Sequence, residues 1–98
     1  MNWLDYKKKF EPCKNWIISN QSLSGAIFWD EKGKCDPWDH CECLIALAIY
    51  EEWEHFWKGV NWFFTNLNED GLIYAEFQNE KPSKLHYESH HAPYIIMP

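Results

Sequence analysis

The sequence predicts an all-α fold built from helical hairpins, and three observations support this class. Apolar residues recur at the three- and four-residue spacing of amphipathic helices along most of the chain. The pair Asp36-Pro37 places a capping side chain directly before a proline, which is a strong signal for the first turn of a helix. A unit made of a helix, a glycine turn and a short extended segment occurs twice, and such units bury their apolar faces by stacking.

The N-terminal part of the chain is predicted to be helical. Residues 2–20 carry an apolar stripe, and Pro12 must start a new helix or kink an existing one because proline lacks a backbone N–H. The turn-forming residues 19–25 end this segment. Residues 26–29 are then expected to be extended, and residues 30–34 to form an exposed turn.

The central helix is predicted to run from Pro37 to about Trp53. Asp36 is its expected N-cap, and Pro37 takes the first helical position, where a missing N–H costs nothing. The apolar run IALAIY starts at Ile45, so this helix is expected to be buried beyond its first turns. No glycine or proline marks its end, which leaves its boundary with the next helix open.

A second long helix is expected at about residues 55–68, where aromatic and aliphatic residues follow a helical period. Asp70-Gly71 is a turn signal, and residues 72–77 alternate enough for a short extended segment. Residues 78–84, QNEKPSK, are predicted to form a polar loop.

The chain contains an internal repeat. Residues 16–28 align without gaps to residues 62–74, 46 positions further on, and tryptophan, asparagine, glycine and isoleucine coincide. The recurring glycines, Gly25 and Gly71, follow helices, where a left-handed residue terminates the helix. We expect one domain over residues 1–98, with repeat units at about 13–54 and 55–98.

Composition and charge narrow the class of partner. The chain has 98 residues with 7 tryptophans, more large aromatic side chains than a small core needs, so some are expected to line a cavity or an interface. The net charge of −6 argues against a nucleic-acid partner. We found no secretion signal and no apolar stretch of membrane-spanning length, so the expected location is cytoplasmic.

The cysteines are therefore expected to be free thiols. Cys35, Asp39, His40 and Cys41 offer atoms that bind zinc, but no CxxC pair accompanies them. We predict no metal and no cofactor.

The motifs SGAIFW (24–29), DPWDH (36–40) and WFFTNLNEDG (62–71) resemble the α/α-toroid proteins of the squalene cyclase and prenyltransferase superfamily, in particular proteins described as terpenoid-cyclase-like. The resemblance implies an incomplete (α/α)6 toroid, with short extended segments after the glycine turns. Such a ring needs about six helical hairpins and this chain supplies about two, so the chain resembles an N-terminal fragment.

The acids at the start of the central helix are the predicted catalytic residues: Asp36, Asp39 and Glu42. The resemblance makes them the nearest substitute for the aspartate cluster of the cyclases. Their alternative role is structural, because acids in a first helical turn are favoured by the helix dipole alone. The predicted substrate-binding residues are Trp29, Trp38 and His40.

A second polar cluster lies near the C-terminus. His86, His90 and His91 are either ligands or solvated residues that cap a helix.

Three functions remain open, and the sequence does not decide whether the chain is an enzyme. The first is a prenyltransferase-like or terpenoid-cyclase-like toroid that binds an isoprenoid, because aromatic faces stabilise carbocations. The second is a glycan-acting domain like the six-hairpin glycosidases, with two carboxylates as acid and base. The third is a non-catalytic module that self-associates or is completed by another chain.

Overall fold

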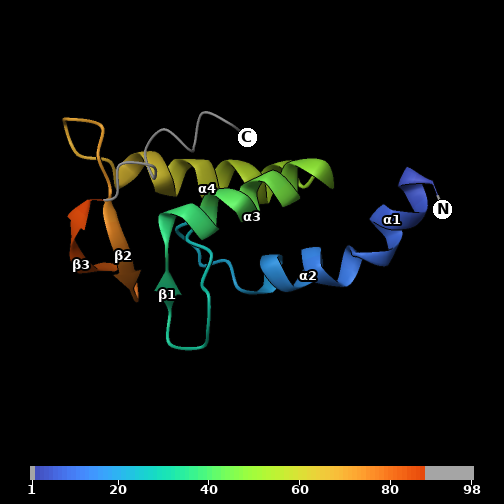
Figure 1. Ribbon diagram of the computed structural model, residues 1–98, viewed down its shortest axis with the longest axis horizontal. Coiled ribbons are helices and arrows are strands. Elements are labelled where there is room, and N and C mark those ends of the chain that lie inside the picture. The colour runs from blue at the N-terminus through green and yellow to red at the C-terminus, as the bar shows by residue number, and fades with distance from the viewer. Residues whose placement is uncertain (1, 88–98) are drawn as a thin grey trace.

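The computed structural model describes residues 2–87, which form four helices and a small sheet (Figure 1). The helices α3 and α4 lie side by side, with the sheet at one end and α1 projecting at the other. The elements are α1 (Trp3–Lys9), α2 (Glu11–Ser19), β1 (Lys34–Cys35), α3 (Pro37–Ile49), α4 (Trp53–Thr65), β2 (Tyr74–Gln78) and β3 (Lys81–Tyr87).

Helices α1 and α3 each start at a side-chain cap. Asn2 and Asp5 form a capping box at α1. The Asp36 carboxylate accepts hydrogen bonds from the backbone N–H groups of Trp38 (2.8 Å) and Asp39 (3.4 Å), which confirms it as the N-cap of α3. The predicted break near Pro12 is also confirmed, because Phe10 separates α1 from α2.

The turn between α3 and α4 has no glycine. Helix α3 ends at Ile49, earlier than predicted, and Glu51 follows in the left-handed conformation with φ 57°. This conformation costs about 1–2 kcal/mol for a residue other than glycine. Because no glycine stands here, the sequence contains no local signal for this boundary. The turn forms where α3 packs against α4.

The prediction of an all-α class is wrong because the chain also contains a three-stranded antiparallel sheet in the order β1-β2-β3. Its central strand, β2, overlaps the extended segment expected at 72–77. Strand β1 falls on the end of the predicted turn at 30–34, whereas residues 26–29 make only an isolated bridge between Ile27 and Gln21.

The predicted loop at 78–84 is in fact a β-hairpin. Asn79 and Glu80, both with positive φ (49° and 66°), form a two-residue turn that joins β2 to β3. Two-residue hairpin turns with positive φ usually contain glycine. This turn has none, so its polar sequence resembled a loop. Pro82 is tolerated because β3 is an edge strand of the sheet.

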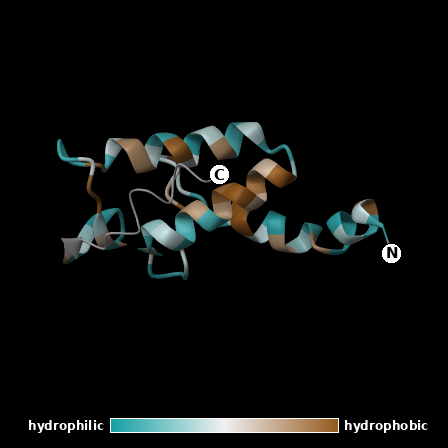
Figure 2. Cartoon of the chain, turned by 45° about the horizontal axis from the view of Figure 1, so that its top comes forward, coloured by the Kyte–Doolittle hydropathy of each residue, from teal (hydrophilic) through white to brown (hydrophobic). Residues whose placement is uncertain are grey.

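The core lies where α3, α4 and β2 meet. Burial alternates along β2, so that Ala75 and Phe77 face the helices, and the Phe77 ring packs 5.1 Å from that of Trp62. The second half of α3 is the most hydrophobic stretch of the helices (Figure 2), and it supplies the buried Leu44 and Leu47.

His40 connects three parts of this core. Its side chain is 1% exposed; Nδ1 accepts a hydrogen bond from the Ile27 N–H (3.3 Å), and Nε2 lies 2.8 Å from the carbonyl oxygen of Gly59 on α4. Because the Ile27 N–H can only donate, Nδ1 is the acceptor, and Nε2 carries the proton that it donates to Gly59. The ring also packs against Trp62, 4.7 Å between centroids.

The repeat is visible in the backbone at the ends of α2 and α4. Asn20 and Asn66 terminate the helices with nearly equal φ and ψ, and each side-chain amide donates to the carbonyl four residues earlier at 2.8 Å. The bonds Ser22 N to Ala26 O and Gly25 N to Ser22 O recur 46 positions later with equal lengths, 2.8 and 3.0 Å. The wider repeat units, 13–54 and 55–98, stay a prediction.

We predict that replacing His40 by leucine destabilises the fold by about 2–4 kcal/mol, because two buried backbone groups each lose a partner. Urea unfolding at pH 7 measures the loss. His55→Leu is the control, since the His55 ring bonds the Gln21 side chain at the partly exposed start of α4. An equal loss in both variants would contradict a central role for His40.

The same variant has a characteristic pH dependence. Burial lowers the pKa of His40 to about 4 from an ordinary 6.5, so between these values the unfolded chain binds more protons than the folded one. Wild-type stability should therefore fall as pH drops through this window, by at most about 1.4 kcal/mol per pH unit from this group. The Leu variant lacks this contribution, so its deficit relative to wild type should shrink towards pH 4.

Several large apolar side chains remain exposed. On α4, Trp53 is 49% and Trp57 61% exposed, and both rings make edge contacts with Phe56. The sequence also predicts that Tyr94, Ile95 and Ile96 take part in an interface together with these α4 residues, but they lie outside the described residues. Within residues 2–87, no helix is long and apolar enough to cross a membrane.

We predict that the chain self-associates through this aromatic surface. Sedimentation at micromolar concentration should show species heavier than the monomer, and Trp53→Ser with Trp57→Ser should shift the distribution towards the monomer. Leu85→Ser is the control, because Leu85 is an exposed leucine on β3 and not on α4. A wild-type monomer that unfolds cooperatively would contradict the prediction.

Candidate functional site

The first two turns of α3 carry the predicted acids, and the structure separates their roles. Asp36 is engaged as the N-cap. Asp39 and Glu42, three positions apart and therefore on one face of the helix, line a groove between α2 and α3. Only two of the three predicted acids thus lie together at a surface that a ligand can reach.

We call this hollow the α2–α3 groove. It is open to solvent, and its volume of about 350 Å³ is within the usual range of ligand pockets. Its lining residues are Trp16, Ile17, Trp29, Asp39, Glu42, Cys43 and Ala46.

The Trp29 ring packs against the ammonium group of Lys34. The Lys34 ammonium lies 3.9 Å from the centroid of the Trp29 ring and 3.1 Å from a carboxylate oxygen of Glu76 on β2. The backbone N–H of Trp29 also donates to the carbonyl of Lys34. The indole, half exposed in a loop, is thereby tied to the sheet.

Hydrogen bonds determine the conformation of the loop after Trp29. The Asp30 carboxylate accepts hydrogen bonds from the backbone N–H groups of Lys32 (2.9 Å) and Lys34 (3.2 Å). Gly33, with φ 82°, accepts a bond from the Asn79 N–H in the hairpin turn, and a Cβ at Gly33 would meet the Asn79 side chain at 2.2 Å. The loop therefore requires glycine at this point.

Asp39 has an altered acidity. Partial burial raises the pKa of its carboxyl, the negative charges of Asp36 and Glu42 raise it further, and the Lys34 ammonium opposes this shift. A raised pKa allows Asp39 to keep its proton at a pH where an exposed aspartate has lost it. A general acid needs a pKa shift in this direction.

Two predicted binding residues lie elsewhere. His40 is in the core, and both of its ring nitrogens form hydrogen bonds. These bonds join α3 to the preceding loop at Ile27 and to α4 at Gly59. Trp38 is exposed, and it is not among the described residues that line the groove.

Trp16 is a groove residue that the sequence analysis missed. In the sequence it stood out only as the counterpart of Trp62 in the repeat, and its side chain is 50% exposed. The available signal was its place one turn before the polar end of α2, at Ser19 and Asn20.

The cysteines near the site are thiols. Cys35 and Cys41 are buried and Cys43 is partly buried; burial raises the thiol pKa values of all three, to about 12 for Cys41 and about 11 for Cys43. Such thiols are poor nucleophiles at neutral pH. Within residues 2–87, no three His, Cys, Asp or Glu side chains lie close enough together to hold a metal ion.

The chain is similar to a glycan-degrading enzyme over most of its length. It is 30% identical over 79 residues to a protein of Mycolicibacterium hassiacum described as an MMP endo-(1,4)-3-O-methyl-alpha-D-mannosidase. The alignment covers 81% of this chain but 22% of that protein, so the chain spans about a fifth of the relative's length. No protein-family profile matches the chain.

This relative belongs to one of the substrate classes that the sequence left open. It is described as an endo-mannosidase, an enzyme that acts on a glycan. The similarity thus fits the glycan-acting alternative better than the isoprenoid one.

We predict that Lys34 tunes Asp39. Because the ammonium favours the ionised carboxyl, Lys34→Met should raise the pKa of Asp39 further. A carboxyl-carbon NMR titration of Asp39 measures this directly, and Lys34→Arg should restore the wild-type value. Lys32→Met is the matched control, since Lys32 is not among the charges that shift Asp39. A lower pKa in Lys34→Met would contradict the assignment.

Proposed function

We propose that this chain belongs to a glycan-acting protein and that its α2–α3 groove binds a sugar unit. The observation that supports this most strongly is the pairing of two exposed indoles, Trp16 and Trp29, with two carboxylates, Asp39 and Glu42, along one groove. The similarity to an endo-mannosidase supports the same class of ligand.

The indoles suit a sugar because a pyranose ring has an apolar face of C–H groups. Stacking this face on an indole removes apolar surface from water on both partners. Trp29 is suited to this role, since Lys34 and Glu76 restrict its ring before any ligand arrives. Restricting the ring in advance lowers the entropy cost of binding.

The carboxylates suit the cleavage of a glycosidic bond. Asp39, with its raised pKa, donates a proton to the glycosidic oxygen as the carbon–oxygen bond breaks. Glu42, exposed on the next turn of α3, acts as the second carboxylate, which activates water or attacks the anomeric carbon. Asp36 keeps its structural role as the cap.

The solvent-open groove also favours a sugar over an isoprenoid as the ligand. An isoprenoid and its carbocations require a dry cavity enclosed by aromatic rings. The α2–α3 groove instead has acids in its wall and is open to water, which suits a ligand covered with hydroxyl groups.

We predict that methyl 3-O-methyl-α-D-mannoside binds the chain and shifts the indole N–H resonance of Trp29. Trp29→Ala should weaken binding at least about fivefold, since an aromatic contact contributes about 1 kcal/mol. Trp57→Ala is the control, because Trp57 is exposed on α4 outside the groove. Equal losses in both variants, or no binding, would contradict the proposal.

Hydrolysis of an α-(1,4)-linked 3-O-methylmannose oligosaccharide tests the catalytic part separately. Asp39→Asn should lower the rate by at least about a hundredfold, because a general acid contributes about 10²–10⁴. Sugar binding without hydrolysis in the wild-type chain would instead identify a non-catalytic glycan-binding module.

A further inference from the structure

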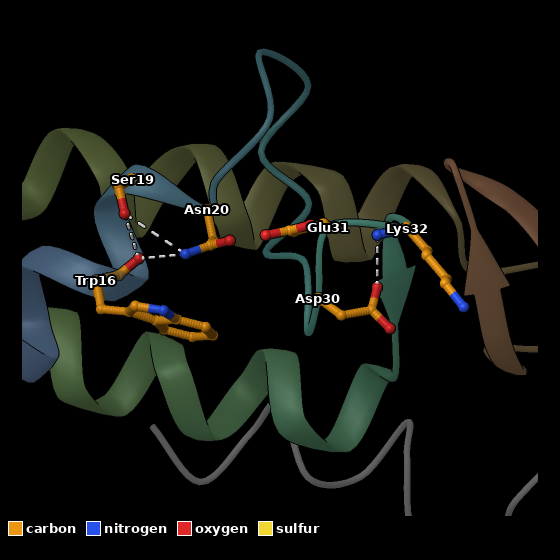
Figure 3. A pocket seen from close by; sticks show the side chains of 6 residues that line it. All are labelled: Trp16, Ser19, Asn20, Asp30, Glu31 and Lys32. Carbon is orange, nitrogen blue, oxygen red and sulfur yellow. Dashed lines mark hydrogen bonds between the residues drawn. The ribbon is translucent and has the colours of Figure 1, made fainter.

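A second hollow shares Trp16 with the α2–α3 groove. We call it the loop hollow; its volume is about 640 Å³, and it is formed by the end of α2 and the loop after Trp29. Its lining residues are Trp16, Ser19, Asn20, Asp30, Glu31 and Lys32. Figure 3 shows the Trp16 indole and the Asp30 side chain on opposite sides of it.

Trp16 joins the two hollows, because it lines both the loop hollow and the α2–α3 groove. Its position is fixed by the end of the helix: its carbonyl oxygen accepts hydrogen bonds from Ser19 Oγ and Asn20 Nδ2, each at 2.8 Å. A ligand that runs along this surface therefore passes from one hollow to the other across a single indole.

The wall opposite Trp16 is preorganised. Asp30 is held by the backbone N–H groups of Lys32 and Lys34, and the loop is anchored to the hairpin turn through Gly33. The Glu31 side chain extends from this wall towards Asn20 (Figure 3). The hollow thus has fixed walls, with Glu31 as an exposed polar group between them.

The acidic side chains that line the two hollows favour an uncharged ligand. Asp30 and Glu31 in the loop hollow and Asp39 and Glu42 in the groove make the surface acidic, with Lys32 as the basic residue in their linings. An anionic glycan would be repelled. A neutral sugar chain instead offers hydroxyl donors to carboxylates and C–H faces to the indole.

We propose that the loop hollow is a second sugar-binding subsite, so that the site takes at least two linked neutral sugar units across Trp16. This inference rests on the proposed function of the α2–α3 groove. It predicts that affinity depends on the number of linked sugar units as well as on the identity of each sugar.

Calorimetric titration of the full chain with one to four α-(1,4)-linked 3-O-methylmannose units tests the proposal. Affinity should rise at least about tenfold from the single sugar to the chain of two or three units, which equals about 1.4 kcal/mol. Glu31→Ala should reduce this gain while leaving affinity for the single sugar unchanged. Trp16→Ala should abolish the gain, because the indole lines both hollows.

Glu69→Ala is the matched control, since Glu69 is an exposed glutamate outside both hollows and should preserve the full gain. Circular dichroism establishes that each variant is folded. Equal affinity for all lengths, with the single sugar still bound, would overturn the second subsite and leave the proposed function standing. Binding of no sugar of any length would overturn both.

Discussion

The hydrogen bonds of the His40 imidazole hold together the parts of this molecule that the site depends on. One ring nitrogen accepts from Ile27 and the other donates to Gly59, so the start of α3 is joined to the preceding loop and to the middle of α4. Burial keeps the ring neutral at neutral pH by lowering its pKa, and only the neutral ring can accept from one side while donating to the other.

This connection requires close approach of the backbone, and two glycines provide it. A Cβ at Gly25 would lie 2.0 Å from the Lys58 carbonyl oxygen, and one at Gly59 would lie 2.2 Å from the Leu44 side chain. The loop that follows Gly25 can therefore rest on α4 and leave towards α3 with Trp29 beside Asp39.

The repeat shows how similar local structure acquires different roles. Trp16 and Trp62 precede the same sequence of helix cap, turn and glycine, with matching hydrogen bonds. Trp62 is 3% exposed because Phe77 and His40 pack against it, whereas Trp16 stays half exposed beside α3 and lines both hollows. Short-range sequence set the backbone of each unit, and the neighbours of each unit determined whether its tryptophan is core or surface.

The sequence alone determined the local features: the cap at Asp36, the pairing of Asp39 with Glu42 on one helix face, and the end of α2 at Asn20. Each depends on residues within about one helical turn, where spacing and capping chemistry act directly. Only the tertiary structure decided the sheet, the left-handed Glu51, the burial of His40 and the part that Trp16 plays in the groove. The physical reason is that strand pairing and burial arise between segments tens of residues apart, so no local pattern encodes them.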